Sequence, residues 1–132
     1  YILDISTPTT PIEAGYIDNI SGDVAVSGNY AYVTNGLNGL VIVDITDLKA
    51  LNVVGSISTR DNAVGVTING NYAYIADLLG GLRVVDVSVP EAPVEVGVFY
   101  TPGITNAVAI SGNYAYVADD GFGLGVYEFM AP

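Results

Sequence analysis

The sequence predicts an all-β fold built from small four-stranded antiparallel sheets, and three observations support that prediction. Gly-Asn-Tyr-Ala-Tyr followed by Val or Ile begins at Gly28, Gly70 and Gly112, so the chain repeats every 42 residues. Apolar residues alternate or cluster in short runs and do not follow the 3.6-residue period of a helix. Gly-Asn turns separate the runs, as between paired strands. A repeat of this length is typical of propeller blades, which bury their faces by stacking on one another.

The first two strands of each unit are expected to form a hairpin. In the unit that begins near Asp23, the first strand is 24–26, with a small residue on one face and valines on the other. The second strand, 30–33, follows a tight turn at 27–29 and places both of its tyrosines on one face. Packing between blades is the expected role of the repeated tyrosines, and a stacking platform for sugar or peptide is the alternative. These residues are Tyr30, Tyr32, Tyr72, Tyr74, Tyr114 and Tyr116.

The third and fourth strands complete the unit. The third, 40–45, is an aliphatic run that contains a carboxylate, and every copy carries a carboxylate at that place. A side chain that every blade needs is expected to fasten the following turn by accepting backbone N–H bonds. The fourth strand, 52–58, lies outermost, where an edge proline or a charge is tolerated. The repeated carboxylates are Asp4, Asp44, Asp86 and Glu128.

Aligned on these strands, the chain divides into four units. Residues 1–21 supply the third and fourth strands of one blade, 22–63 and 64–105 form complete blades, and 106–132 supply the first three strands of a last blade. A closed propeller needs at least about four blades, so about three blades stay open unless something covers both ends. The expected partners are further blades of the same longer chain, other copies that complete a ring, or copies joined head to tail in a filament.

The run Leu40-Val41-Ile42-Val43-Asp44 resembles the pentapeptide that gives LVIVD repeats their name, and the Gly-Asn-Tyr-Ala-Tyr-Val turns look like the rest of that repeat. The resemblance covers essentially the whole chain. It implies a seven- or eight-bladed propeller in a large secreted or surface-attached protein of bacteria or archaea, mostly without assigned activity. The last copy departs from the pattern, since residues 125–129 replace the aliphatic run.

Charge and composition exclude several classes of partner. The net charge is −11, which repels phosphate backbones and anionic lipid, so nucleic acid is not an expected partner. The longest apolar run, 40–43, is far shorter than the roughly 18 residues of a membrane helix, and no membrane insertion is expected. The chain opens within a strand pattern and without methionine, so Tyr1 is expected to be a cut end.

The residue types also limit the chemistry. The chain has no histidine and no cysteine, which excludes a Ser-His-Asp triad, a thiol nucleophile, a disulfide framework and imidazole or thiolate zinc sites within it. No cofactor is expected. Calcium is the alternative at Asp119 and Asp120, where two carboxylates and loop carbonyls suit a hard cation, although a solvated turn explains the same residues.

Loop lengths indicate where a ligand could bind. The spacing from the fourth-strand glycine to the next second-strand glycine is shorter in the first copy (15 to 28) than in the next (55 to 70). In propellers that loop shares a face with the turn between the second and third strands, and such faces commonly bind partners. The candidate ligand-binding residues there are Asp18, Asn19, Asp23, Asn35, Asn38, Arg60, Asp61, Asn62, Asp77, Thr105, Asn106, Asp119 and Asp120.

These features favour a non-enzymatic repeat scaffold or binding module of a secreted or cell-surface protein, with a protein or glycan as its ligand. A self-assembling structural protein that completes blades between chains is the first alternative. A carboxylate-based glycan hydrolase or lyase is the second, because paired acids remain chemically possible.

Overall fold

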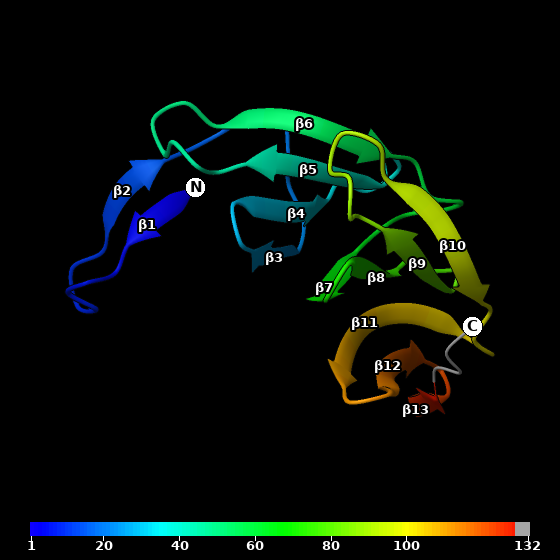
Figure 1. Ribbon diagram of the computed structural model, residues 1–132. Helices are drawn as coiled ribbons and strands as arrows, with labels where there is room; N and C mark the ends of the chain where they lie inside the picture. The colour runs from blue at the N-terminus through cyan, green and yellow to red at the C-terminus, as the bar shows by residue number, and fades with distance from the viewer. Residues whose placement is uncertain (129–132) are drawn as a thin grey trace.

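The computed structural model describes residues 1–128, in which thirteen strands form four antiparallel sheets (Figure 1). The first sheet pairs β1 (Ile2–Asp4) with β2 (Ile12–Gly15). The second sheet contains β3 (Val24–Ser27), β4 (Tyr30–Thr34), β5 (Leu40–Asp44) and β6 (Asn52–Ile57). The third sheet contains β7 (Gly65–Asn69), β8 (Tyr72–Ala76), β9 (Leu82–Asp86) and β10 (Val94–Phe99). The fourth sheet contains β11 (Ile104–Ser111), β12 (Tyr114–Asp120) and β13 (Gly123–Glu128).

The predicted all-β class is confirmed, and the sheets are arranged as open propeller blades. Each complete sheet is a meander in chain order, with β3 and β7 at the inner edge and β6 and β10 at the outer edge (Figure 1). The inner strands β3, β7 and β11 lie beside one another. Among the described residues no sheet closes on itself. No helix in 1–128 is long and apolar enough to cross a membrane.

Neighbouring sheets pack face to face through one repeated interface. The strand alternation gives each sheet a tyrosine face, which carries the tyrosines of its second strand, and an alanine face, which carries the alanine between them. In the first interface Tyr32 of the second sheet packs with Ala73 of the third. In the next, Tyr74 of the third sheet packs with Ala115 of the fourth. The core of this protein therefore lies between sheets, as expected for blades that cannot bury a face alone.

Backbone contacts join the sheets at both ends of the strands. At one end, Ala63 N–H donates to Gly36 O at 3.1 Å, and Leu78 and Thr105 exchange two hydrogen bonds of 3.1 Å at the equivalent place. At the other end, a side chain on Gly55 would overlap the carbonyl oxygen of Pro90 in the next sheet. Glycine lets these backbones approach closely.

The tyrosines are less uniformly buried than the sequence suggests. Tyr74 is 7% exposed, whereas Tyr72, two residues earlier on the same face, is 40% exposed. Tyr32 is buried like Tyr74, and desolvation by burial raises the pKa of both phenols. Tyr116 is exposed because no further described sheet covers the tyrosine face of the fourth sheet. Among the described sheets, the packing role between blades thus applies to Tyr32 and Tyr74, with Tyr30 partly buried against the same core as Tyr32, whereas Tyr72 lies at a rim.

Candidate functional site

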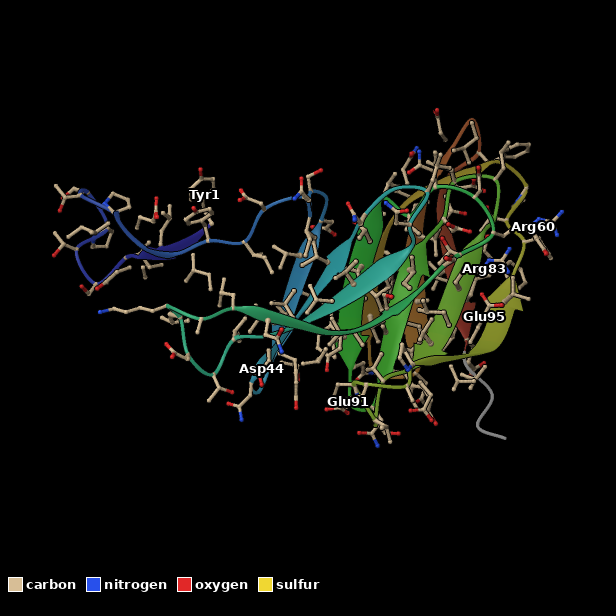
Figure 2. The ribbon with its side chains drawn as sticks, turned by 90° about the horizontal axis from the view of Figure 1, so that it is seen from above. Tyr1, Asp44, Arg60, Arg83, Glu91 and Glu95 are labelled. Carbon is tan, nitrogen blue, oxygen red and sulfur yellow. The ribbon has the colours of Figure 1, made fainter. Side chains whose placement is uncertain are left out.

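Three of the repeated third-strand carboxylates fasten the turns that follow them, while the turn after Glu128 lies outside the described residues. Asp4, Asp44 and Asp86 each accept a hydrogen bond of 2.8 Å from the backbone N–H two residues later. For Asp44 the side chain of Thr46, and next its N–H, lower the pKa of the carboxyl group. Glu128 pairs with Tyr114 in the ladder as Asp86 pairs with Tyr72. Figure 2 shows Asp44 and Glu91 at this end of the strands, away from Arg60.

A second set of polar residues follows the second strands, at the opposite end. This end, which we call the loop face, consists of the turns 35–39, 77–81 and 119–123 and the loops 16–23, 58–64 and 100–103. Asp77 is fully buried there, and its carboxylate accepts hydrogen bonds from the Thr59 hydroxyl and, at 3.0 Å, from Asp61 N–H. It therefore ties the loop that enters the third sheet to the turn beyond β8.

The equivalent residues in the other copies perform the same task. Asp119 is buried and accepts hydrogen bonds from Thr101 Oγ1 at 3.3 Å and Gly103 N–H at 3.2 Å. Asn35 accepts one from Ser21 N–H at 3.4 Å and donates one to Asn19 O at 3.5 Å. Residues 35, 77 and 119 are thus repeated loop fasteners.

Two further acids of the candidate face bind backbone groups. Asp23 Oδ2 accepts a hydrogen bond of 3.0 Å from Val66 N–H and so joins the second sheet to the third. Asp61 Oδ2 accepts one of 3.0 Å from Leu79 N–H. Polar residues of this face that sequence reasoning proposed for ligand binding are therefore engaged in holding the loops.

The thirteen candidate residues differ in accessibility. Asp77, Thr105 and Asp119 are buried, and Asn35, Asp61 and Asn62 are half-buried. Exposed side chains remain at Asp18, Asn19, Asp23, Asn38, Arg60, Asn106 and Asp120. Among the described residues, no three acidic side chains gather as a group that could hold a metal ion.

Each turn of the loop face also leaves one large apolar side chain in water. Leu37 is 74% exposed, Leu79 71% and Phe122 69%, one on each of the three turns of the loop face. Single exposed apolar side chains are common on protein surfaces, so what distinguishes these three is that each turn of one face carries one. Sequence reasoning had concentrated on acids and amides and missed them. The available signal was the presence of apolar residues within each of these glycine-containing turns, one in 35–39, two in 77–81 and one in 119–123.

The third sheet also carries a polar cluster that the other sheets lack. Arg83 is buried, and its Nε lies 3.5 Å from Asp77 Oδ2 while its Nη1 lies 3.3 Å from Glu95 Oε1. The guanidinium carbons of Arg83 and Arg60 lie 5.4 Å and 5.7 Å from the centre of the Tyr100 ring, a cation–π arrangement. Figure 2 shows Arg60, Arg83 and Glu95 together at one side of the molecule.

This cluster lies at the rim of the loop face. Arg60 Nη1 donates a hydrogen bond of 3.2 Å to the Tyr100 hydroxyl, and both residues are exposed. At the place of Arg83 the other copies have Val41 and Gly125, so the repeat itself does not require an arginine here. The buried Arg83 is thus a departure from the repeat that joins Asp77 of the loop face to Glu95 of the outermost strand.

Comparison with known proteins agrees with the repeated architecture. The LVIVD repeat matches residues 1–19, 20–59, 61–101 and 102–126, which together cover nearly all of the chain. No curated protein matches the chain. Since the same repeat accounts for the four successive parts of the sequence, the chain belongs to the LVIVD repeat family.

Proposed function

We propose that this LVIVD repeat chain is a non-enzymatic binding module whose loop face holds a protein partner. One observation carries the proposal: every described turn of that face leaves an apolar side chain, Leu37, Leu79 or Phe122, in water. The buried acids of the same turns hold the loops beneath them, which keeps these side chains in place. A rigid scaffold with exposed apolar side chains on its loops is a common arrangement for binding.

The charges of the face favour a particular kind of partner. The loop face also carries exposed carboxylates at Asp18 and Asp120, and the chain has a net charge of −11. Long-range attraction therefore favours a basic partner, while burial of apolar surface supplies the affinity. An extended peptide segment that combines apolar and basic residues fits both properties.

The non-enzymatic part of the proposal rests on how the acids are used. Asp77 is buried against Arg83 and accepts hydrogen bonds from the loop, so its carboxylate is engaged by groups of the protein itself. Asp119 is similarly engaged. With no histidine or cysteine in the chain, these acids would have been the principal catalytic candidates on this face. The secreted or cell-surface location implied by the family resemblance is part of the same proposal.

A synthetic peptide array gives the first test. The protein would be applied to the array, and the peptides that bind it would be resynthesised with a fluorophore. Their affinity for the protein would then be measured by fluorescence anisotropy. Replacing Leu37, Leu79 and Phe122 together by serine is expected to weaken binding at least about tenfold, or about 1.4 kcal/mol. These side chains are exposed, so the variant should fold normally.

The control variant replaces by serine two exposed valines on the outermost strand of the third sheet, Val94 and Val98. It should bind the selected peptides as the original chain does. Equal binding by all three proteins would contradict the proposed face, and so would an array in which no peptide distinguishes the loop-face variant from the control.

A further inference from the structure

Two of the three basic residues of this chain meet at the ring of Tyr100, on the rim of the loop face. The guanidinium carbon of Arg60 lies 5.7 Å from the ring centre and that of Arg83 lies 5.4 Å from it. The remaining basic residue, Lys49, is exposed in the turn after β5, at the other end of the strands. Since Arg83 is buried, Arg60 is the only exposed basic residue of the loop face (Figure 2).

The repeat requires neither Arg60 nor Tyr100. One repeat length further along the chain, Pro102 stands in the place of Arg60, and one repeat length back, Ser58 stands in the place of Tyr100. The loop that contains Pro102 is fastened through Asp119 in the same way as the loop that contains Arg60 is fastened through Asp77. Holding the loop therefore does not explain the arginine and the tyrosine, and the pair is available for recognition.

The buried Arg83 fixes the tyrosine of this pair. Its side chain is 5% exposed, and its charge is balanced by the carboxylates of Asp77 and Glu95. Its Nη2 is buried and has no hydrogen-bond partner among residues 1–128. A cation–π contact is stronger when the cation is desolvated, so the ring of Tyr100 is held against Arg83.

Arg60 is held in place but is not neutralised. Its Nη1 donates a hydrogen bond of 3.2 Å to the Tyr100 hydroxyl, and within the described part of the chain no carboxylate lies at ion-pair distance from it. That bond uses one N–H of the guanidinium and leaves the others for a ligand. A planar guanidinium binds a carboxylate through two parallel hydrogen bonds. In a chain with a net charge of −11, this exposed arginine is a specific place for an anionic group.

An exposed leucine lies next to this arginine. Asp61, which follows Arg60 in the sequence, accepts a hydrogen bond of 3.0 Å from Leu79 N–H. Leu79 is 71% exposed and Tyr100 is 54% exposed. One small area of the loop face thus combines an apolar side chain, an aromatic ring and a guanidinium group.

We infer that this area, formed by Arg60, Tyr100 and Leu79, binds a carboxylate of the partner peptide that lies next to an apolar residue. The carboxylate pairs with Arg60, and the apolar side chain covers Leu79 and the ring of Tyr100. The inference rests on the proposed function, because Leu79 is one of the side chains proposed to contact the partner. It adds specificity to that function: the net charge attracts a basic segment from a distance, whereas Arg60 selects one acidic group within it.

Nuclear magnetic resonance of the arginine side chains tests the inference with defined probes. The chain has two arginines and therefore two Nε–H signals, which Arg60→Gln assigns. N-acetyl-leucine supplies a C-terminal carboxylate, N-acetyl-glutamyl-leucine amide supplies a side-chain carboxylate, and N-acetyl-glutaminyl-leucine amide supplies neither. We expect an acidic probe to shift the Arg60 signal in a saturable way and the neutral probe to leave it nearly unchanged. The acidic probe that binds more tightly identifies the source of the carboxylate.

Peptides selected on the array extend the test to the partner. Arg60→Gln should weaken binding of a peptide with an acidic residue about three- to fivefold, as for an exposed ion pair, and should leave its amide counterpart unchanged. Lys49→Gln removes the same charge at the other end of the strands and is the matched control, which should bind both peptides as the original chain does. Both positions are exposed, so both variants should fold.

Equal shifts from the acidic and neutral probes, or no saturable shift, would overturn the inference, and so would equal losses in the Arg60 and Lys49 variants. A failure of the proposed function gives a different result. If replacing Leu37, Leu79 and Phe122 by serine weakens peptide binding but acidic and neutral probes act alike, the proposed function stands and the inference fails. If that variant binds peptides normally while the acidic probe still shifts Arg60, the loop face is not the peptide site and only the carboxylate site remains.

Discussion

Two polar positions per repeat hold the loops of this protein by different means. Asp44 and Asp86 fasten exposed turns through short local hydrogen bonds, and their carboxylates remain in contact with water. Asp77 and Asp119 are buried and reach back to a loop more than a dozen residues earlier in the chain. The first kind depends on local sequence alone, whereas the second forms only when the loop that enters a sheet folds onto the turn beyond its second strand.

The exposed aspartates predict a contribution to stability that depends on pH. Hydrogen bonding lowers the pKa of Asp4, Asp44 and Asp86 in the folded chain below their ordinary values. The stabilisation is therefore fully present above the unfolded-state pKa of about 4, and it is lost as the pH falls through the lower folded-state pKa. A variant with asparagine at positions 44 and 86 keeps an acceptor oxygen but cannot titrate. We expect its urea midpoint to vary less between about pH 5 and pH 2 than that of the original chain.

The charge control for this experiment is Asp120→Asn together with Asp18→Asn, which removes two exposed carboxylates from the loop face. It should retain the steeper pH dependence. If the turn variant and the control lose the same dependence, net charge and not the turn hydrogen bonds would explain the effect.

Burial separates the two tyrosines of the middle hairpin and predicts different costs of truncation. Tyr74→Ala removes a 7% exposed ring from the interface with the fourth sheet, which should cost about 3–5 kcal/mol of unfolding free energy. Tyr72→Ala removes a 40% exposed ring and should cost about 1 kcal/mol. Chemical denaturation of the two variants measures the difference. Equal losses would contradict the assignment of the interface to one tyrosine of the pair.

The buried ion pair of the third sheet predicts that stability lost on removing Arg83 can be partly restored by copying the uncharged residues of the second sheet. Arg83→Val should cost about 3–5 kcal/mol, because it leaves the buried Asp77 carboxylate without its cation. In the second sheet, the equivalent positions are occupied by the uncharged residues Val41 and Asn35. Adding Asp77→Asn to the Arg83→Val variant copies that solution and should restore part of the lost stability. A double variant no more stable than Arg83→Val would show that the two side chains do not act as a pair.

At the scale of strands, the two equivalent glycines of the fourth strands should differ in their tolerance of a side chain, because a neighbouring backbone lies against only one of them in the described structure. Gly55 and Gly97 occupy equivalent places in β6 and β10 beside a β-bulge. A Cβ on Gly55 would overlap the Pro90 carbonyl oxygen, so Gly55→Ala should cost at least about 1–3 kcal/mol. On Gly97 the nearest described atom is Val84 Cβ at 3.5 Å, an ordinary contact.

Gly97→Ala is therefore expected to change stability by less than about 1 kcal/mol, in either direction. Thermal unfolding of the two variants measures the contrast. A large loss at Gly97 would mean that another backbone lies against that strand as Pro90 lies against β6.

Strands could be predicted from this sequence because local pattern and repeat agree. The alternation of residues 30–33 and the Gly28 turn identify a hairpin without any knowledge of the fold, and the copies at residues 70–75 and 112–117 repeat it. The four-strand meander and the LVIVD resemblance are confirmed. The bulge beside Gly55 could not be foreseen, since it depends on how the third and fourth strands pair.

The candidate site was harder to predict because its contacts cross between elements. Arg83 looks like an ordinary polar residue of a strand until the fold places Asp77, Glu95 and Tyr100 around it. Asp77 looks like a solvated turn residue until the loop containing Thr59 covers it. Sequence reasoning identified the face but assigned binding to side chains that the structure uses as fasteners.

At the scale of the whole molecule, stacking without closure predicts a gradient of local stability. The second and third sheets form the central interface, while β1 and β2 form a separate two-stranded sheet, and such sheets are marginal alone. Hydrogen exchange followed by mass spectrometry should therefore show the slowest exchange in β4, β5, β8 and β9 and the fastest in β1 and β2.

Nearly uniform exchange across the four sheets would contradict this gradient, because it would show that the described sheets open as one cooperative unit. Faster exchange in β8 and β9 than in β1 and β2 would contradict it as well, because the third sheet packs against a neighbouring sheet on each of its two faces.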